Sequence, residues 1–389
     1  MPLQTSETPP IRPIAAKAGA TLDVFEVFGR DDAVELAISY LRRGENLLLD
    51  EPRRFGKTSF AELLVSQLPT GWFGRKVSLQ GRQTTTEVAV SLLGTLRSAV
   101  GEKRGFLEIV GRYVRQVDVG PFQLSVGYED KPLVALEQAV QSISESLLKD
   151  GTRLVLAVDE LTEVVREIGK LEGAQSARAF LGTLRRLREE CRGVLWVLTG
   201  SIGFHHVLTE IGATSQAINN TKVFKLGPLD RSWASWLAGC VLLDAGIEQN
   251  SIESGLVRDE IARATDGIAI LVHMIGEHVR DECLKVVAVE DVGLVLDECF
   301  RRNDRSANLT HLLTRIDDYY GENVGIAEIL LDEASSGNLQ AGDLTEKSLR
   351  IVVEMLIEDH YLERTVNGQL AWKYQSLQRL WRVRRGLMR

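Results

Sequence analysis

The chain is organised around one stretch, Asn46-Leu47-Leu48-Leu49-Asp50-Glu51-Pro52-Arg53-Arg54-Phe55-Gly56-Lys57-Thr58-Ser59-Phe60. Its opening residues are a short apolar run, which is typical of a buried strand. Gly56-Lys57-Thr58 follows a tight loop, and the residues from Phe60 onward begin an amphipathic helical pattern. A strand, a loop ending in Gly-Lys-Thr and a helix form the context that a phosphate-binding loop requires. The stretch therefore predicts nucleotide binding on an α/β sheet.

The chemistry expected of this loop follows from its backbone and from two side chains. Backbone N–H groups of the loop and the positive end of the following helix would cradle the β-phosphate of a nucleotide. Lys57 would reach the β- and γ-phosphates, and the hydroxyl of Thr58 would ligate Mg²⁺. One position departs from the usual G-x-x-x-x-G-K-[ST] pattern, because Glu51 stands where the first glycine belongs.

The bulk composition is that of a soluble globular protein. The chain has 389 residues, enough for two or three domains, with 44% hydrophobic and 26% charged residues. Its net charge of −8 means that any basic surface must be local. The four cysteines have no C-x-x-C spacing, which indicates reduced thiols of a cytoplasmic protein. No apolar run approaches about 18 residues, so no membrane span is expected.

A second informative stretch, Arg153-Leu154-Val155-Leu156-Ala157-Val158-Asp159-Glu160, is an almost wholly apolar strand that ends in two carboxylates. Strands of this kind belong to parallel sheets buried on both faces, and ligands gather at the carboxyl ends of such strands. Asp159 suits the Mg²⁺ shell, and Glu160 suits the base that orients an attacking water. The alternative is that these acids only cap a following helix.

Three further strands are predicted, at Arg75–Leu79, Gly193–Ser201 and Lys222–Leu226. The second of these ends in small polar residues, and Thr199 or Ser201 could touch the γ-phosphate or the attacking water. Alternatively, both side chains only satisfy backbone groups at the strand end. Five strands separated by helices predict a three-layer α/β domain. A surface hairpin is also predicted between about residues 117 and 128.

The two ends of the chain differ from this α/β region. Residues 1–20 hold four of the nine prolines and no apolar periodicity, which predicts a flexible lead-in. After about residue 230 the strand signal stops and helices follow. The last part shows helices near 309–319, 324–335 and 344–358, and then a hairpin signal around Asn367-Gly368. Three helices followed by a hairpin is the order of a winged helix.

Several of these motifs occur in the order and rough spacing of a known family: Phe28-Gly29-Arg30, Pro52-Arg53-Arg54-Phe55-Gly56-Lys57-Thr58-Ser59, Val158-Asp159-Glu160, Thr199-Gly200-Ser201 and Leu226-Gly227-Pro228-Leu229. The chain resembles the archaeal-type ATPases of the AAA+ superfamily, which lie near the STAND signalling ATPases and the origin-recognition ATPases. The implied domains are a flexible N-terminal segment over residues 1–20, a P-loop ATPase core over 21–229, a helical lid over 230–304 and a winged-helix domain over 305–389.

The resemblance also implies a ligand and roles for residues. It implies a five-stranded parallel sheet that binds ATP with Mg²⁺, with adenine held near the Phe28-Gly29-Arg30 turn and the lid. Lys57 and Thr58 would bind phosphate and metal, Asp159 and Glu160 would be the Walker B pair, and Ser201 would be the first sensor. The phosphate loop itself would comprise Pro52, Arg53, Arg54, Phe55, Gly56, Lys57, Thr58 and Ser59.

Two departures from the family pattern stand out. Relatives commonly have Gly-x-Pro where this chain has Gly267-Ile268-Ala269, which bears on the contact between lid and nucleotide. Many AAA+ proteins also place an arginine finger between the sensor strand and the last strand, but residues 202–225 contain no arginine. Arg185, Arg186 and Arg188 could serve instead, although a solvated helix face is the simpler interpretation.

The leading function is a slow ATPase switch, whose ATP or ADP state controls the lid and winged helix and the engagement of a separate protein partner or self-assembly. One alternative is a DNA-binding initiator or transposition-type regulator, and another is an ATP-dependent scaffold with little turnover. The segment from Leu370 to Arg389 contains no Asp or Glu. It contains six cationic residues: Lys373, Arg379, Arg382, Arg384, Arg385 and Arg389. They could meet DNA phosphates, or they could pair with acidic groups at a protein contact.

Overall fold

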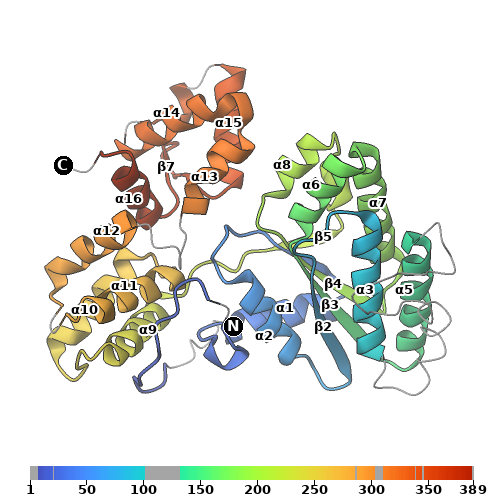
Figure 1. Ribbon diagram of the computed structural model, residues 1–389, viewed down its shortest axis with the longest axis horizontal. Coiled ribbons are helices and arrows are strands. Elements are labelled where there is room, and N and C mark those ends of the chain that lie inside the picture. The colour runs from blue at the N-terminus through green and yellow to red at the C-terminus, as the bar shows by residue number, and fades with distance from the viewer. Residues whose placement is uncertain are drawn as a thin grey trace. The chain divides into compact units, whose positions relative to one another are not determined.

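The computed structural model describes residues 8–20, 22–100, 132–284, 287–302, 310–337, 339–343 and 346–387. The hairpin predicted near residues 117–128 lies outside these ranges. The chain forms two compact units (Figure 1). The sheet unit comprises Ala33–Asp50 and Lys57–Leu226, and the helical unit comprises Met1–Asp32, Glu51–Gly56 and Gly227–Arg389.

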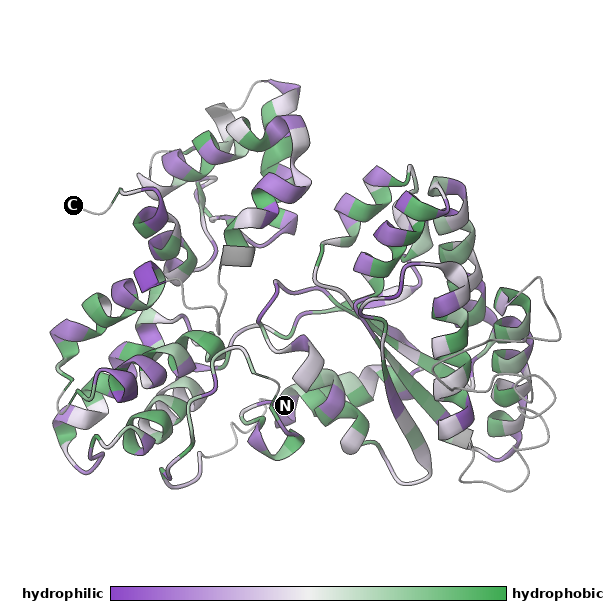
Figure 2. Cartoon of the chain, viewed as in Figure 1, coloured by the Kyte–Doolittle hydropathy of each residue, from purple (hydrophilic) through white to green (hydrophobic). Residues whose placement is uncertain are grey.

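The sheet unit is built on five parallel strands in the order β2-β3-β4-β1-β5. Their bounds are β1 Asn46–Leu49, β2 Trp72–Ser78, β3 Arg153–Asp159, β4 Val194–Thr199 and β5 Thr221–Phe224. The central strands are apolar and buried on both faces, as the sequence predicted (Figure 2). The register places Leu49 opposite Thr199 and Ser78 opposite Asp159, so polar residues meet at the carboxyl edge of the sheet.

Helices cover the sheet on both faces, which gives the three predicted layers. Figure 1 shows α1 and α2 on one side and α3, α5 and α7 on the other. The helices of this unit are α1 Asp31–Arg42, α2 Lys57–Ser66, α3 Thr85–Val100, α5 Pro132–Lys149, α6 Leu161–Leu171, α7 Ala174–Glu190 and α8 Phe204–Glu210, with a 3-10 turn η2 at Ser215–Ala217. Each helix turns an apolar stripe to the strands; that of α7 includes Phe180, Leu184 and Leu187.

The lid region of the helical unit is a bundle of four helices. They are α9 Arg231–Asp244, α10 Ile252–Ala264, α11 Ala269–Asp281 and α12 Val292–Arg302, the last preceded by a 3-10 turn η3 at Val289–Asp291. Asp230 caps α9 by accepting a hydrogen bond from the backbone N–H of Trp233 at 2.9 Å. Helix α9 is buried on most of its surface because α10 and α11 pack against it from two sides.

Residues 8–20 of the N-terminal segment, which was predicted to be a flexible lead-in, pack against helices of the same unit. The backbone N–H of Ile14 donates to the carbonyl of Cys240 on α9, and that of Ala18 donates to Glu277 on α11 at 2.8 Å. Ala16 and Ala18 are buried in the lid core. A Cβ on Gly239 would lie 2.8 Å from Ile11 Cδ1, so a glycine on the lid makes room for this segment. A 3-10 turn η1 follows at Val24–Glu26.

The terminal region has the predicted order of three helices and a hairpin. Its helices are α13 Thr310–Tyr319, α14 Val324–Ser335 and α15 Lys347–Glu358, with 3-10 turns η4 at Gly321–Asn323 and η5 at Ala341–Asp343. The antiparallel strands β6 Leu362–Arg364 and β7 Leu370–Trp372 follow, and α16 Gln375–Arg384 comes last. Gly368 has a φ of 76°, which is why glycine follows Asn367 in the turn.

Candidate functional site

The phosphate-binding loop predicted from the sequence leaves β1 and enters α2 at Lys57. Gly56, just before the helix, has a φ of 82°, a conformation that favours glycine. Arg54 also adopts a left-handed φ, of 73°, which is uncommon for a residue with a side chain and is often found at functional loops. Pro52 and Phe55 are buried, whereas Gly56 is exposed and Arg53, Arg54, Thr58 and Ser59 are partly exposed.

The structure brings the predicted metal-binding pair together. The hydroxyl of Thr58, at the start of α2, donates to Asp159 Oδ2 at 2.8 Å. Asp159 is buried at the end of β3, and its other oxygen accepts from the hydroxyl of Thr199 and from the backbone N–H of Glu160. Thr199 therefore fixes the Asp159 carboxylate through the oxygen that does not face Thr58. The sequence had suggested either a contact with the nucleotide or a bond to backbone groups for Thr199, and this role is neither. A hydroxyl and a carboxylate are hard oxygen donors of the kind Mg²⁺ prefers.

Glu160 occupies the N-cap position of α6, but its side chain makes no capping hydrogen bond. Its Oε2 instead accepts from the backbone N–H of Ser201 at 3.2 Å and from the Ser201 hydroxyl at 2.5 Å. The backbone of Glu160 lies in the left-handed region, with a φ of 61°. Burial, and then the nearby charge of Glu163, raise the pKa of Glu160 above its usual value, against the lowering influence of the Ser201 hydrogen bond.

The two strand ends that carry these residues are held together by a close backbone approach. A Cβ built on Gly200 would lie 2.0 Å from Thr162 Oγ1, so only glycine fits between β4 and the first turn of α6. The same Thr162 hydroxyl accepts from the backbone N–H of Ile202 at 3.3 Å. Sequence reasoning singled out Thr199-Gly200-Ser201 but missed Thr162 and Glu163, which lie in α6 and carry no motif of their own.

The Phe28-Gly29-Arg30 turn lies in the helical unit and packs on the start of α9. Phe28 meets Trp236 edge-on at 4.9 Å between ring centroids, and a Cβ on Gly29 would lie 2.6 Å from Trp233. The Arg30 guanidinium donates to the carbonyl of Pro228 at 3.3 Å. Burial lowers the pKa of Arg30 to about 10, against the raising influence of Glu51 and Asp230. Adenine contact at this turn stays a prediction.

Glu51, the residue at the unexpected first position of the loop, has a structural partner in the same unit. It is buried, and its Oε1 accepts from the backbone N–H of Gly227 at 3.0 Å. Arg54 makes a comparable tie, because its guanidinium donates to the carbonyl of Gly19 at 3.1 Å. The loop is thus joined to the turn at residues 227–228 and to the N-terminal segment. A glycine in place of Glu51 would lack the first of these contacts.

The lid turn that departs from the family pattern also has a defined geometry. Gly267 has a φ of 70°, and its carbonyl accepts from the backbone N–H of Leu229 at 2.9 Å. A Cβ there would lie 2.2 Å from the Leu229 carbonyl oxygen, so glycine is required. Ile268, next in the turn, is buried in the lid core. The described residues thus show tight packing at this turn without the proline common in relatives.

The three arginine-finger candidates all have structural partners on the sheet unit. Arg188 is buried and donates to Asn220 Oδ1 at 3.0 Å and to the carbonyl of Ala217 at 2.8 Å. Arg185 pairs with Glu189 one turn along α7 at 2.8 Å, and Arg186 pairs with Glu137 on α5. The solvated helix face that was the simpler interpretation fits Arg185 and Arg186, which are partly exposed and exposed, but it is wrong for Arg188, which is buried.

Two of the C-terminal cations are likewise engaged within the helical unit. Arg379 on α16 makes two hydrogen bonds to the buried carboxylate of Asp297 on α12 and one to the Gly293 carbonyl. Arg385 pairs with Glu328 and Asp332 on α14 at 3.3 and 2.9 Å. Both pairs lie within the helical unit, so they test neither the DNA alternative nor the protein-contact alternative. Arg389 lies outside the described residues.

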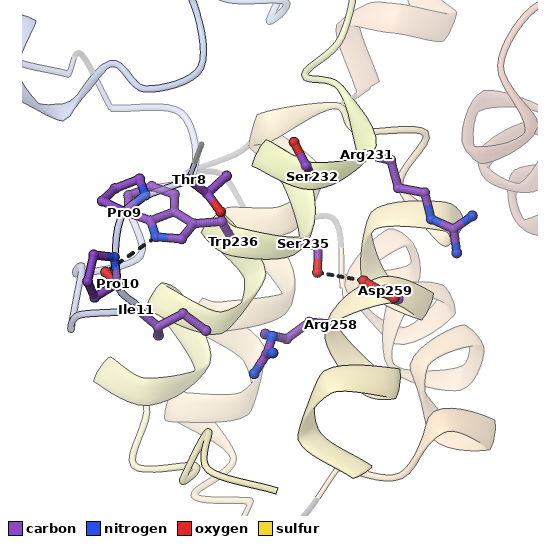
Figure 3. A pocket seen from close by; sticks show the side chains of 10 residues that line it. All are labelled: Thr8, Pro9, Pro10, Ile11, Arg231, Ser232, Ser235, Trp236, Arg258 and Asp259. Atoms are coloured by element: carbon purple, nitrogen blue, oxygen red, sulfur yellow. Dashed lines mark hydrogen bonds between the residues drawn. The ribbon is translucent and has the colours of Figure 1, made fainter. Parts of the chain in front are cut away.

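A cavity of about 610 Å³ also occurs in the helical unit, at the N-terminal segment (Figure 3). Trp236 Nε1 donates to the Pro10 carbonyl at 3.4 Å along one wall, and the Ser235 hydroxyl donates to Asp259 at 2.7 Å on another. It is lined by Thr8, Pro9, Pro10, Ile11, Arg231, Ser232, Ser235, Trp236, Arg258 and Asp259. None of the predicted site residues lines it.

Comparison with solved structures supports the fold. The Walker-type ATPase PABY2304 of Pyrococcus abyssi is similar to this chain with a TM-score of 0.62 at 15% sequence identity, and the match covers 96% of this chain and 99% of that chain. The ORC2 protein of Aeropyrum pernix in its ADPNP-ADP complexes gives a TM-score of 0.46 at 12% identity over 93% and 96% of the two chains. This second similarity is too loose to bear on the fold.

No protein-family model matches the chain, and no curated protein matches it significantly. At 15% identity the likeness to the Pyrococcus abyssi protein shows the fold alone. The predicted fold class is confirmed at that level: a three-layer α/β fold with a five-stranded parallel sheet and a helical C-terminal region, similar to that of the Walker-type ATPase. No helix among the described residues is long and apolar enough to cross a membrane.

Proposed function

We propose that this protein binds ATP with Mg²⁺ and hydrolyses it slowly, as an AAA+ switch. The observation that carries the proposal is the hydrogen bond between Thr58 Oγ1 and Asp159 Oδ2, 2.8 Å long. It joins the residue after the loop lysine to the carboxylate that ends strand β3. A phosphate-loop hydroxyl beside a strand-end aspartate is the arrangement that P-loop nucleotide hydrolases use to hold a metal.

Each predicted site residue of the sheet unit then has a proposed role toward the nucleotide. Lys57, buried at the first position of α2, would neutralise the β- and γ-phosphates. Thr58 and Asp159 are the residues that would hold Mg²⁺, which would supply further neutralisation of phosphate charge when bound. Glu160 would accept a proton from the attacking water, with Ser201 beside it as the sensor. From the sequence resemblance we also propose that Phe28, Gly29 and Arg30 contact adenine.

Slow turnover follows from the engagement of the finger candidates. An arginine finger is worth roughly 10³–10⁵ in rate where one acts. Arg185, Arg186 and Arg188 all bond to groups of the sheet unit itself. The same observation supports a second candidate function, an ATP-dependent assembly scaffold that scarcely hydrolyses its nucleotide. In either case ATP or ADP would control the lid and the terminal region, for which we also propose a winged-helix fold and a protein partner.

Titration calorimetry and a turnover assay test the proposal together. ATP binding that strengthens with Mg²⁺, accompanied by measurable phosphate release, supports the switch. Mg²⁺-dependent binding and nucleotide-dependent assembly with no phosphate release support the scaffold. An Asp159→Ala variant should lose the Mg²⁺ dependence, because it removes a carboxylate from the metal shell. Absence of ATP binding by the folded wild-type protein overturns both functions.

A further inference from the structure

The Ser201 hydroxyl lies between two carboxylates. Its oxygen is 2.5 Å from Glu160 Oε2 and also within hydrogen-bond distance of Glu163 Oε1. A serine hydroxyl carries one proton and can donate it to one acceptor at a time. The two acids therefore compete for the same proton. Glu160 has the role of base in the proposed function, whereas Glu163 has been given no role so far.

The positions of the three groups are fixed by the packing around them. Ser201 is buried, and Gly200 before it fits against Thr162 with no room for a side chain. Glu163 follows Thr162 in the first turn of α6, so the helix fixes the backbone from which its side chain reaches Ser201. Ser201 also holds Glu160 by its backbone N–H at 3.2 Å. This second bond keeps the Glu160 carboxylate in place whichever acid receives the hydroxyl proton.

We propose that Glu163 is a positioning residue for the base: it accepts the hydrogen bond of the Ser201 hydroxyl. Glu160 Oε2 then accepts only from the Ser201 backbone N–H and keeps a second lone pair open to the proton of the attacking water. Without Glu163, the hydroxyl would donate to Glu160 and occupy the lone pair that catalysis needs. Asp159 and Lys57 are the other charged groups that act on Glu160. This proposal rests on the proposed function, because it assigns Glu163 a part in ATP turnover.

The alternative is a purely structural role, in which Glu163 only stabilises α6. An acidic residue in the first turn of a helix is favoured by the positive end of the helix dipole. That effect would act on folding stability, and it would not depend on whether Ser201 has a hydroxyl. The two interpretations therefore differ in how the effects of Glu163 and Ser201 combine.

The test is a double-mutant cycle in kcat with Glu163→Ala, Ser201→Ala and the double variant. We expect Glu163→Ala to lower kcat about tenfold with KM nearly unchanged, the scale of one hydrogen bond to a charged group. In the Ser201→Ala background the same change should have no further effect. Glu163→Gln keeps an acceptor oxygen and should restore most of the activity. Glu167→Ala is the matched control, since Glu167 is another acid of α6 and pairs with Lys170.

The possible outcomes distinguish a failure of the role of Glu163 from a failure of the proposed ATPase function. The role of Glu163 would be overturned if the double variant lost kcat by the product of the two single losses. It would also be overturned if Glu163→Ala lowered only the melting temperature. In both cases ATP turnover itself would stand. A kcat equal to that of the wild type in Glu163→Ala would do the same. A folded wild-type protein that binds no ATP would overturn the proposed function, and the role of Glu163 with it.

Discussion

The ring of Phe55, in the phosphate-binding loop, lies 5.2 Å from the ring of Tyr374, measured between centroids. Tyr374 is the N-cap residue of α16, and both rings are buried within the helical unit. The first turn of α16 also contacts the lid, because Asp266 Oδ2 accepts from the backbone N–H and the hydroxyl of Ser376, both at 2.6 Å. A residue one position before Gly56 thus touches the start of the last helix. Any change in loop conformation alters the packing at that point.

Removal of this ring pair should loosen α16. A Phe→Ala change at a buried position costs about 3 kcal/mol of folding stability. We expect Phe55→Ala to speed amide hydrogen exchange in residues 375–384 while leaving β3 and β4 unchanged. Leu171→Ala, at an exposed position of α6, is the control. Exchange in α16 that matches the wild type would show that the ring pair does not stabilise the helix start.

Nucleotide binding should require Lys57. The side chain is buried at the start of α2, where loss of its charge leaves the phosphates without a cation in a partly desolvated site. We expect Lys57→Ala to weaken ATP binding at least a hundredfold, which corresponds to about 3 kcal/mol. Circular dichroism should stay native, and Lys170→Ala should bind normally. Wild-type affinity in a folded Lys57→Ala protein would exclude this loop as the nucleotide site.

Hydrolysis should separate from binding at Glu160. Glutamine keeps the size of the side chain and its acceptor oxygen toward Ser201, but it cannot accept a proton from water. We expect Glu160→Gln to retain ATP while kcat falls by about 10²–10⁴, the usual contribution of a general base. Turnover at the wild-type rate would mean that Glu160 only begins α6.

The sheet and the central site residues were predictable because each is encoded locally. An apolar run followed by Gly56-Lys57-Thr58, and another followed by Asp159-Glu160, specify strands and the chemistry at their ends. Parallel pairing then forces the strand ends to one edge, so the approach of Thr58 to Asp159 needed no knowledge of the remaining structure.

The sequence could not predict interactions between residues that belong to no motif and to no periodic apolar pattern. The N-terminal segment has no periodicity of its own, and its packing depends on glycines of the lid such as Gly239. Glu163 is an ordinary helix residue until Ser201, 38 positions later, lies against it. Arg379 looked like a free cation because Asp297, its partner, is 82 positions earlier in the chain.

Gly200, between Thr199 and Ser201, should be irreplaceable. A Cβ at position 200 would lie 2.0 Å from Thr162 Oγ1 and 2.8 Å from Thr162 Cγ2, so β4 or the first turn of α6 would have to move. We expect Gly200→Ala to destabilise the sheet unit by about 2 kcal/mol, the typical effect of overpacking. Combining it with Thr162→Ala should recover part of the stability, because that change removes the clashing oxygen. Thermal unfolding measures both, and an unaffected Gly200→Ala protein would contradict the close approach.

The C-terminal cations test whether the terminal region binds a polyanion. Arg379 and Arg385 already pair with carboxylates of α12 and α14, so their charge is largely compensated. Arg379→Ala should therefore act on stability: it leaves the buried Asp297 without its main partner and costs about 2 kcal/mol. Arg382→Ala should leave the melting temperature unchanged and serves as the matched control on the same helix.

With two of these cations compensated, we expect no salt-dependent binding to duplex DNA, with or without ATP. Fluorescence anisotropy at several salt concentrations measures this directly. A phosphate site would instead give a steep dependence of affinity on salt, and removing arginines in an Arg382→Ala, Arg384→Ala double variant would flatten that slope by roughly one unit for each phosphate no longer neutralised. That result would show that Arg382 and Arg384 contact DNA phosphates. Binding that persists unchanged in the double variant would place the DNA site elsewhere on the chain.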